Sequence, residues 1–156
     1  FTAIRAVWPK EKPLGVRVSA TDWIEGGWTL QDSVVYAQEL KKLGCDFICA
    51  SSGGSSPDQQ IDVGPGYQVP MARRIREDAE IPTIAVGLIN EPAQADQAIR
   101  DGAADLIAIG RGMSYNPRWA WHAAEVLRDQ AAFPPQYARS HPSMRFGDFT
   151  KIAPPR

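Results

Sequence analysis

Apolar residues gather in four short segments of the chain, and mainly polar stretches separate them. Each segment has the length and the branched side chains of a strand that is buried in a protein interior. The chain therefore predicts four buried strands, and their starts lie roughly 30 residues apart. These segments span residues 14–19, 46–51, 82–87 and 105–110.

A helical pattern of apolar residues follows each of these segments. The pattern is clearest between Leu30 and Leu43, where Thr29 can cap the start of a helix and Gly44 can end it. The predicted helices span residues 30–43, 69–80, 91–103 and 117–130.

The starts of the last two helices carry capping signals. Asn90 is expected to cap the helix at 91–103, and Asn116 followed by Pro117 is expected to begin the last helix. At the other end of the chain, Ile4 and Trp8 have the spacing expected at the end of an amphipathic helix whose beginning lies outside this sequence.

Strands and helices alternate along the chain, which is typical of parallel strands joined by right-handed crossovers. Four such units predict an α/β fold that is half of an eight-stranded TIM barrel. An open, doubly wound sheet of the flavodoxin type is the alternative. The first strand favours the barrel, because Gly15, Arg17 and Ser19 share one of its faces, and in a barrel this face is the interior.

Composition narrows the function classes. The chain has 156 residues, of which 44% are hydrophobic and 22% are charged, as in an ordinary globular domain. Its net charge of -1 gives no field to attract nucleic acid or an anionic membrane. No apolar stretch approaches the roughly 20 residues of a membrane span, so we expect a soluble cytoplasmic protein.

The two cysteines, Cys45 and Cys49, are too few for a disulfide framework and lack the partners of a zinc site. We expect both to be buried thiols. The sequence shows no metal cluster and no arrangement of nucleophile and base. His122 is expected to pack at the surface of a helix, and His141 has no partner nearby in sequence.

Glycines follow the last two predicted strands at equivalent positions. Gly87-Leu88 and Gly110-Arg111 each stand where a strand ends, so backbone N–H groups there can approach an anion closely. In barrels, the loops after the last two strands form the usual phosphate site, and Arg111 adds a cation whose fork suits phosphate. Tight turns without a ligand are the alternative interpretation.

Two other features leave their interpretation open. Arg17 needs compensation if it is buried, and either an acidic neighbour on another strand or a flavin or other carbonyl-rich ligand would supply it. The long loop at 51–67 is rich in small polar residues, and loops of this kind are either functional or mobile.

Six motifs stand out together, namely Leu14–Ala20, Cys49–Gly54, Gly64–Gln68, Val86–Ile89, Ala104–Arg111 and Pro135–Arg139. As a set they resemble the C-terminal half of the old yellow enzyme family. The similarity is strongest to its bacterial, thermophilic-like branch of NADPH-dependent flavin reductases. The resemblance covers residues 1–139, which would be the last four βα units of a TIM barrel, and leaves residues 140–156 as a C-terminal extension.

The resemblance implies an enzyme that holds FMN at the mouth of a barrel. Such an enzyme passes hydride from NADPH or NADH through FMN to an alkene conjugated to a carbonyl or nitro group, as in an enone. Arg17 then contacts the pyrimidine edge of the flavin, and Ser52 and Gly53 lie beside the ribityl chain. The residues expected to hold the FMN phosphate are Gly87, Leu88, Gly110 and Arg111.

The resemblance also implies contacts between subunits. Arg139, in the motif that begins with Tyr137, matches an arginine that enters the active site of a neighbouring subunit, which implies a homo-oligomer. Trp119 falls near an aromatic residue that borders the substrate pocket in some relatives.

The family's catalytic residues belong to the first four βα units, so none is expected in this chain, and a companion N-terminal half-barrel chain or segment is required. The alternative is a non-catalytic half-barrel module that binds phosphate or FMN and self-associates. Other FMN barrels, such as the dihydroorotate- and glycolate-oxidising enzymes, would be expected to have a lysine where Arg17 stands.

Overall fold

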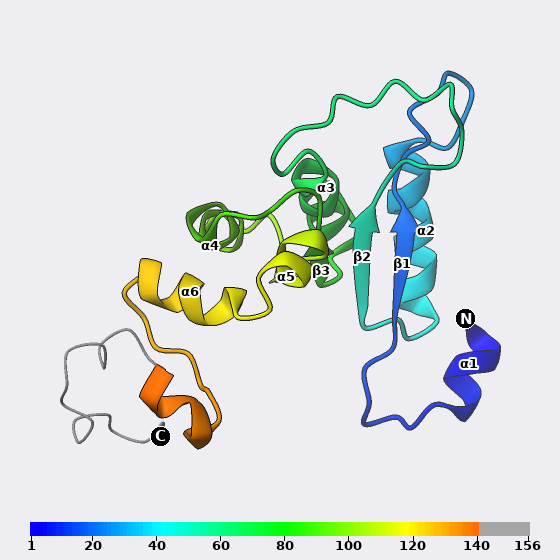
Figure 1. Cartoon of the computed structure of the whole chain (residues 1–156). Coiled ribbons are helices and arrows are strands. Elements are labelled where there is room, and N and C mark those ends of the chain that lie inside the picture. The colour runs from blue at the N-terminus through cyan, green and yellow to red at the C-terminus, as the bar shows by residue number, and fades with distance from the viewer. Residues whose placement is uncertain (141–156) are drawn as a thin grey trace.

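The computed structural model describes residues 1–140, and these form four strands and several helices (Figure 1). The strands are β1 (Gly15–Ser19), β2 (Phe47–Ser51), β3 (Thr83–Ala85) and β4 (Leu106–Ile107). The α-helices are α1 (Thr2–Val7), α2 (Leu30–Lys42), α3 (Val69–Ala79), α4 (Pro92–Arg100), α5 (Arg111–Tyr115) and α6 (Trp119–Val126). A 3-10 helix, η1 (Pro135–Ser140), ends the described part.

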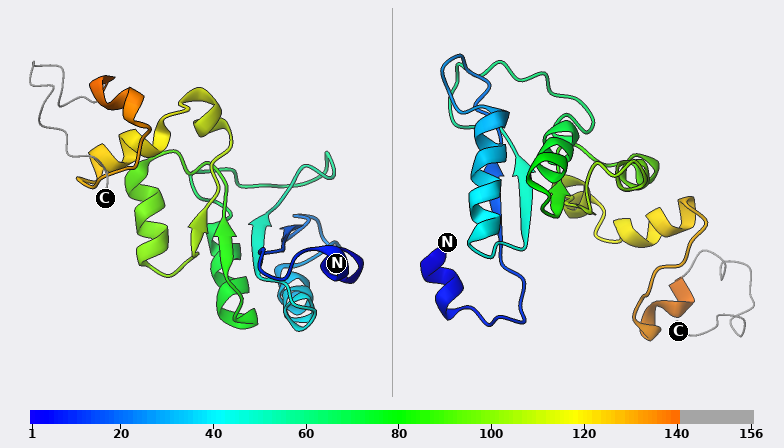
Figure 2. Two further views of the ribbon diagram at one scale, coloured as in Figure 1. Left: turned by 90° about the horizontal axis from the view of Figure 1, so that it is seen from below. Right: turned by 180° about the vertical axis from the view of Figure 1, so that it is seen from behind.

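The four strands form one parallel sheet in the order β1-β2-β3-β4. A doubly wound sheet reverses its strand order and carries helices on both faces, whereas successive strands of a barrel are neighbours throughout. Here the order never reverses. Helices α2 and α3 lie behind the sheet in Figure 1 and in front of it in the rear view of Figure 2. The prediction of four βα units in a half-barrel arrangement is confirmed, and the doubly wound alternative is wrong.

The hydrophobic core lies between the sheet and these helices. Alternate strand residues such as Ile48 and Ala85 point toward Val34 on α2 and Ile75 on α3, and all four are almost fully buried. At the start of α2, the side chain of Thr29 accepts the N–H of Asp32, whose carboxylate in turn accepts the N–H of Thr29. This capping box confirms the predicted start of the helix.

The opposite face of the sheet has no helix packed on it within residues 1–140. It carries Gly15 and Arg17 of β1 beside Phe47 and Cys49 of β2, in direct register. The Phe47 ring lies so close over Gly15 that any side chain there would collide with it. On β4 of the same face, Leu106 is 61% exposed. In a closed barrel this face is the packed interior.

Two Asp residues bind the amino ends of the strands together. The carboxylate of Asp46, just before β2, accepts the N–H of Leu14 at 2.7 Å, and its own N–H donates to the Leu14 carbonyl. Asp105, just before β4, makes the same pair of bonds with Thr83 at the start of β3. The same local arrangement thus recurs after two βα units.

Several predicted boundaries are wrong. Asn90 does not cap α4, because Pro92 occupies the first turn and the extended residue before it, Glu91, is the N-cap. The last helix begins at Trp119 instead of Pro117 and ends at Val126 instead of Gln130. The third and fourth strands are shorter than predicted, and α5 was not predicted at all.

The predicted end of a helix near the start of the sequence is confirmed, since α1 contains Ile4 and ends before Trp8. Across residues 1–140, no helix has both the length and the apolar character that crossing a membrane would require.

Candidate functional site

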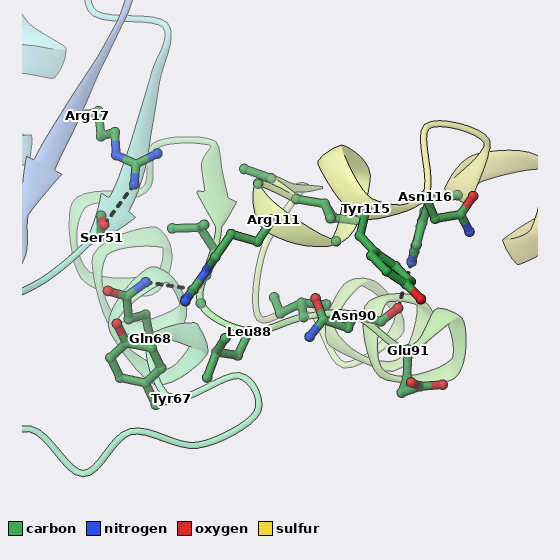
Figure 3. A pocket seen from close by; sticks show the side chains of 18 residues that line it. Arg17, Ser51, Tyr67, Gln68, Leu88, Asn90, Glu91, Arg111, Tyr115 and Asn116 are labelled. Atoms are coloured by element: carbon green, nitrogen blue, oxygen red, sulfur yellow. Dashed lines mark hydrogen bonds between the residues drawn. The ribbon is translucent and has the colours of Figure 1, made fainter.

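A groove of about 740 Å³ lies at the carboxyl ends of the strands. The turns after β3 and β4 form much of its wall, and Arg17 reaches it from β1 (Figure 3). Six of the predicted site residues line this one groove although they are spread over 100 positions of sequence: Arg17, Gly87, Leu88, Gly110, Arg111 and Trp119.

The turn after β3 has an unusual backbone. Gly87 has φ +121° and Leu88 has φ +51°, so two successive residues lie on the side of the φ axis that L side chains avoid. A Cβ on Gly87 would also lie 2.8 Å from Nε2 of Gln68. Within residues 1–140 the N–H groups of Gly87 and Leu88 donate to no acceptor. This turn therefore offers two free donors beside the groove.

The turn after β4 adds a charge. Gly110 has open space where a Cβ would lie, and its N–H also lacks an acceptor within residues 1–140. Arg111 follows it and extends across the groove toward Gln68 and Leu88 (Figure 3). In the described part of the chain, no hydrogen bond or ion pair engages the guanidinium of Arg111.

Arg17 is the second cation of the groove. Its Nη2 donates to Oγ of Ser51 at 3.0 Å, and no carboxylate of residues 1–140 pairs with it. The interpretation of Arg17 as half of a buried salt bridge is therefore wrong for the described part. The groove has two arginines on its wall and one acidic residue, Glu91, so it favours an anionic ligand.

Cys49 lies directly beside Arg17 in the sheet. Burial raises the pKa of the Cys49 thiol, and the nearby positive charge of Arg17 offsets this only in part. The thiol is therefore protonated at neutral pH and is a poor nucleophile. Burial likewise raises the pKa of Cys45. Both cysteines are buried free thiols, as predicted.

Ser52 and Gly53 do not line the groove. They lie in an adjoining hollow of about 410 Å³, and Arg17 and Ser51 line both spaces. The Ser52 side chain is buried and donates to Oε1 of Gln68 at 2.9 Å. Gly53 has φ +83°, which a glycine adopts without strain.

Trp119 lies at the far end of the groove, where its Nε1 donates to the carbonyl of Asn90 at 2.6 Å. Tyr137 lies outside the groove. Its ring packs at a tilt of 59° against Trp121, with centroids 5.5 Å apart, and lies under the guanidinium of Arg118. The side chain of Arg139 and all of residues 141–156, including His141, lie outside the described residues.

The comparisons with known proteins agree with this geometry. The model of the NADH:flavin oxidoreductase / NADH oxidase family matches residues 2–130, which is most of the chain. The chain belongs to this family. Its members are TIM barrels, so the four βα units are a portion of such a barrel, and the oxidoreductase class and flavin cofactor inferred from the sequence are those of the family.

Three relatives carry the name NADPH dehydrogenase. The chain is 45% identical to the protein of Geobacillus thermodenitrificans over 137 residues. It is 44% identical to those of a second Geobacillus strain and of Halalkalibacterium halodurans. Each match covers 88–90% of this chain but only 39–40% of the relative. The chain therefore spans about two fifths of the length of these proteins.

Sequence reasoning from this family assigned no role to several residues that line the groove. These are Ser51, Tyr67, Gln68, Asn90, Tyr115 and Asn116. The motif that contains Tyr67 and Gln68 was visible, but nothing in its spacing shows that the loop folds back beneath the turn after β3. Asn116 turns toward His122, and its Nδ2 lies 2.7 Å from the ring Nδ1. His122 is exposed, as predicted.

Proposed function

We propose that this chain holds FMN for an NAD(P)H-dependent flavin oxidoreductase of the ene-reductase type. One observation carries the proposal: two arginines that lack an acidic partner within residues 1–140, Arg17 and Arg111, line a single groove together with free N–H groups of two glycine turns. Family membership identifies the ligand that fits such a groove as a flavin nucleotide.

The phosphate would lie between the two turns. The N–H groups of Gly87, Leu88 and Gly110 would donate to its oxygens, and Arg111 would add a charge-assisted bond. The absence of a Cβ on Gly110 leaves space for the oxygens to approach the backbone. The donors present therefore fit a phosphate monoester.

The ring would lie toward Arg17. When bound, FMN supplies the hydride relay between nicotinamide and the activated alkene. Arg17 is held by Ser51, so its guanidinium is already oriented, and it would stabilise negative charge on the flavin ring. Ser52 and Gly53 would border the ribityl chain from the adjoining hollow.

The relatives' names support NADPH as the hydride donor, with NADH as the alternative. The resemblance to the thermophilic-like branch of old yellow enzymes supports an enone or nitroalkene as the acceptor. We propose a cytoplasmic location, which is compatible with two free, buried thiols.

Partners complete the site. Eight strands close a TIM barrel, so the open face of this four-stranded sheet would be covered by four further βα units, from the same polypeptide or from a companion chain. These units would supply the side chains that bind the substrate and the group that donates a proton to it. A second copy of the enzyme would receive Arg139, and Tyr137 and Trp119 would border that contact.

The second candidate is a binding module without catalysis, in which two copies cover each other's open faces. The exposed side chain of Leu106 favours a partner that covers this face of the sheet, and that partner could be four further βα units or a second copy. The deciding experiment is the visible spectrum of the purified protein before and after addition of FMN, with every co-purifying chain identified by mass.

A flavin band near 450 nm, retained after excess FMN is removed and accompanied by a chain with the other four βα units, is the expected result. A flavin band on a pure homo-oligomer that oxidises no NADPH would support the binding module. Protein that stays colourless with its companion chain present would refute the FMN-holding role and would leave only a module that binds phosphate.

A further inference from the structure

The motif Gly64–Gln68 has no role in the site described so far, although Gln68 lines the floor of the groove. Gln68 is the N-cap residue of α3, and only 2% of its surface is exposed. Burying an amide is unfavourable unless both of its ends are hydrogen-bonded. The partners of this amide therefore show what it holds in place.

The amide of Gln68 joins two turns. Its Oε1 accepts the hydroxyl of Ser52, in the turn after β2, at 2.9 Å. Its Nε2 donates to the carbonyl of Val86, directly before the glycine turn after β3, at 3.1 Å. One rigid, planar group thus fixes the separation between the two turns.

The same loop contacts the glycine turn in two more ways. The N–H of Gly66 donates to the carbonyl of Gly87 at 2.8 Å. A Cβ on Gly87 would lie 2.8 Å from Nε2 of Gln68 and 3.2 Å from Cε1 of Tyr67. Hydrogen bonds and steric contact therefore hold this turn in one position.

We propose that Gln68 is a positioning residue for the anion site. It holds the Gly87-Leu88 turn so that the free N–H groups face the groove, and it links this turn to Ser52. The inference rests on the proposed function, because it takes the phosphate of FMN as the anion. An amide suits the task because it offers an acceptor to one turn and a donor to the other without charge.

The test compares two ligands that differ only in the phosphate, FMN and riboflavin. It uses the protein as it occurs, with any co-purifying chain retained. Gln68→Met keeps the length of the side chain and removes both hydrogen bonds. FMN affinity is expected to fall about tenfold or more, the scale of one or two lost hydrogen bonds, whereas riboflavin affinity changes much less.

Gln97→Met is the matched control, because Gln97 is an exposed glutamine of α4 whose side chain bonds only to Asp101 within residues 1–140. It is expected to leave both affinities unchanged. Equal losses for FMN and riboflavin in Gln68→Met would mean general damage to the fold and would overturn the inference.

Ser52→Ala is the milder second variant, and it decides the question if Gln68→Met does not fold. It breaks only the bond between the two turns, so it is expected to lower the preference for FMN in the same direction and by less. An unchanged preference in Ser52→Ala would overturn the link between the turns.

The failures of the two proposals are distinguishable. Wild-type protein that binds neither flavin refutes the proposed function, and this inference with it. Wild-type protein that prefers FMN to riboflavin, together with a Gln68→Met variant that keeps the same preference, refutes the role of Gln68 alone.

Discussion

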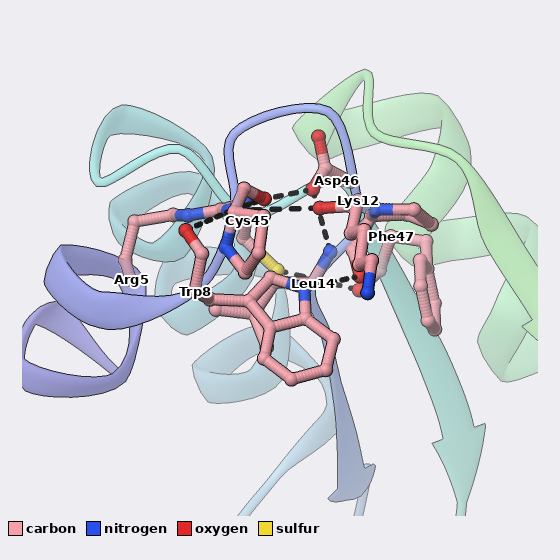
Figure 4. Close-up of polar contacts among 9 residues, drawn as sticks. Arg5, Trp8, Lys12, Leu14, Cys45, Asp46 and Phe47 are labelled. Carbon is pink, nitrogen blue, oxygen red and sulfur yellow. Dashed lines mark hydrogen bonds and ion pairs between the residues drawn. The ribbon is translucent and has the colours of Figure 1, made fainter.

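The two ends of the parallel sheet differ in whether their arginines have acidic partners within residues 1–140. At the amino ends, Arg5 pairs with Asp46 at 3.3 Å and Arg76 pairs with Asp105 at 3.0 Å. Figure 4 shows the first of these clusters, in which Arg5 also donates to backbone carbonyls of the turn that follows α1. At the carboxyl ends, no carboxylate of residues 1–140 pairs with the groove arginines.

This difference suggests that the arginines at the amino ends stabilise the fold and that those at the carboxyl ends bind a ligand. A paired arginine has already used its hydrogen-bonding capacity within the fold, whereas an unpaired one keeps it for a ligand. The division is the one expected of a barrel, whose active site lies at the carboxyl ends of its strands. Substitutions at one end should therefore change ligand affinity and those at the other end should change the free energy of unfolding.

The largest effect is expected at the carboxyl end. Arg111→Ala should weaken FMN binding by about 2 kcal/mol, or about 30-fold, because it removes a charge-assisted hydrogen bond to the phosphate. Fluorescence titration of the flavin measures the affinity. Arg100→Ala, which removes an arginine paired with Asp96 on the exposed surface of α4, should leave the affinity unchanged. Equal affinity in wild type and Arg111→Ala would remove Arg111 from the phosphate site.

The next effect is expected at the amino end. Asp105→Ala should lower the free energy of unfolding by about 1.5 kcal/mol, because it leaves the N–H of Thr83 without its acceptor and Arg76 without its acidic partner. Denaturant titration measures this change. Asp96→Ala removes only an exposed pair within one helix and should cost less than about 0.5 kcal/mol. A loss of FMN affinity in Asp105→Ala at full folding would contradict the division between the two ends.

The described part of the chain leaves one buried polar side chain at the amino end of the sheet without a hydrogen-bond partner. The hydroxyl of Thr83 is buried and makes no hydrogen bond within residues 1–140. Thr83→Val keeps the shape of the side chain and should raise the free energy of unfolding by about 1 kcal/mol. Thr83→Ser keeps the hydroxyl and loses a methyl group, so it should lower that free energy by a similar amount. Destabilisation by valine would show that the hydroxyl has a partner after all.

The smallest effect concerns pH. A hydrogen bond from Arg76 lowers the pKa of Asp105 below its ordinary value of 3.8. A depressed folded-state pKa gives stability that is complete above the unfolded pKa and is lost as the pH falls through the folded one. The stability difference between wild type and Asp105→Asn should therefore shrink between about pH 5 and pH 2. The change is small because the Asp105 side chain is 37% exposed, and a constant difference would contradict it.

Much of the fold was predictable because local patterns decide it. The capping box at Thr29 and the apolar repeat that follows it need no tertiary information. At α4 the local signal is Pro92, which places the N-cap at Glu91 and not at Asn90. The same signal at Pro117 gives the wrong start for the last helix, because Oδ1 of Asn116 accepts the N–H of Arg118 and the helix begins at Trp119.

Some residues of the site could likewise be predicted from local signals, whereas others could not. Glycines at strand ends are local signals, and they indicated Gly87 and Gly110, which both line the groove. Gln68 left no such signal, because its role depends on contacts with Ser52 and Val86, which lie 16 and 18 residues away. The orientation of Trp119 toward Asn90 depends likewise on a contact across 29 residues.

The bond between Asp46 and Leu14 determines the direction in which the Arg17 side chain, in the middle of β1, points. Successive residues of a strand point to opposite faces, so a slip of one residue between β1 and β2 would turn Arg17 away from the groove and toward the helices. The carboxylate of Asp46 holds the chain just before the strand begins, three residues from Arg17. It thereby fixes the alignment that places Arg17 opposite Cys49. A hydrogen bond at the amino end of β1 thus determines that Arg17 lies on the face of the sheet that borders the groove.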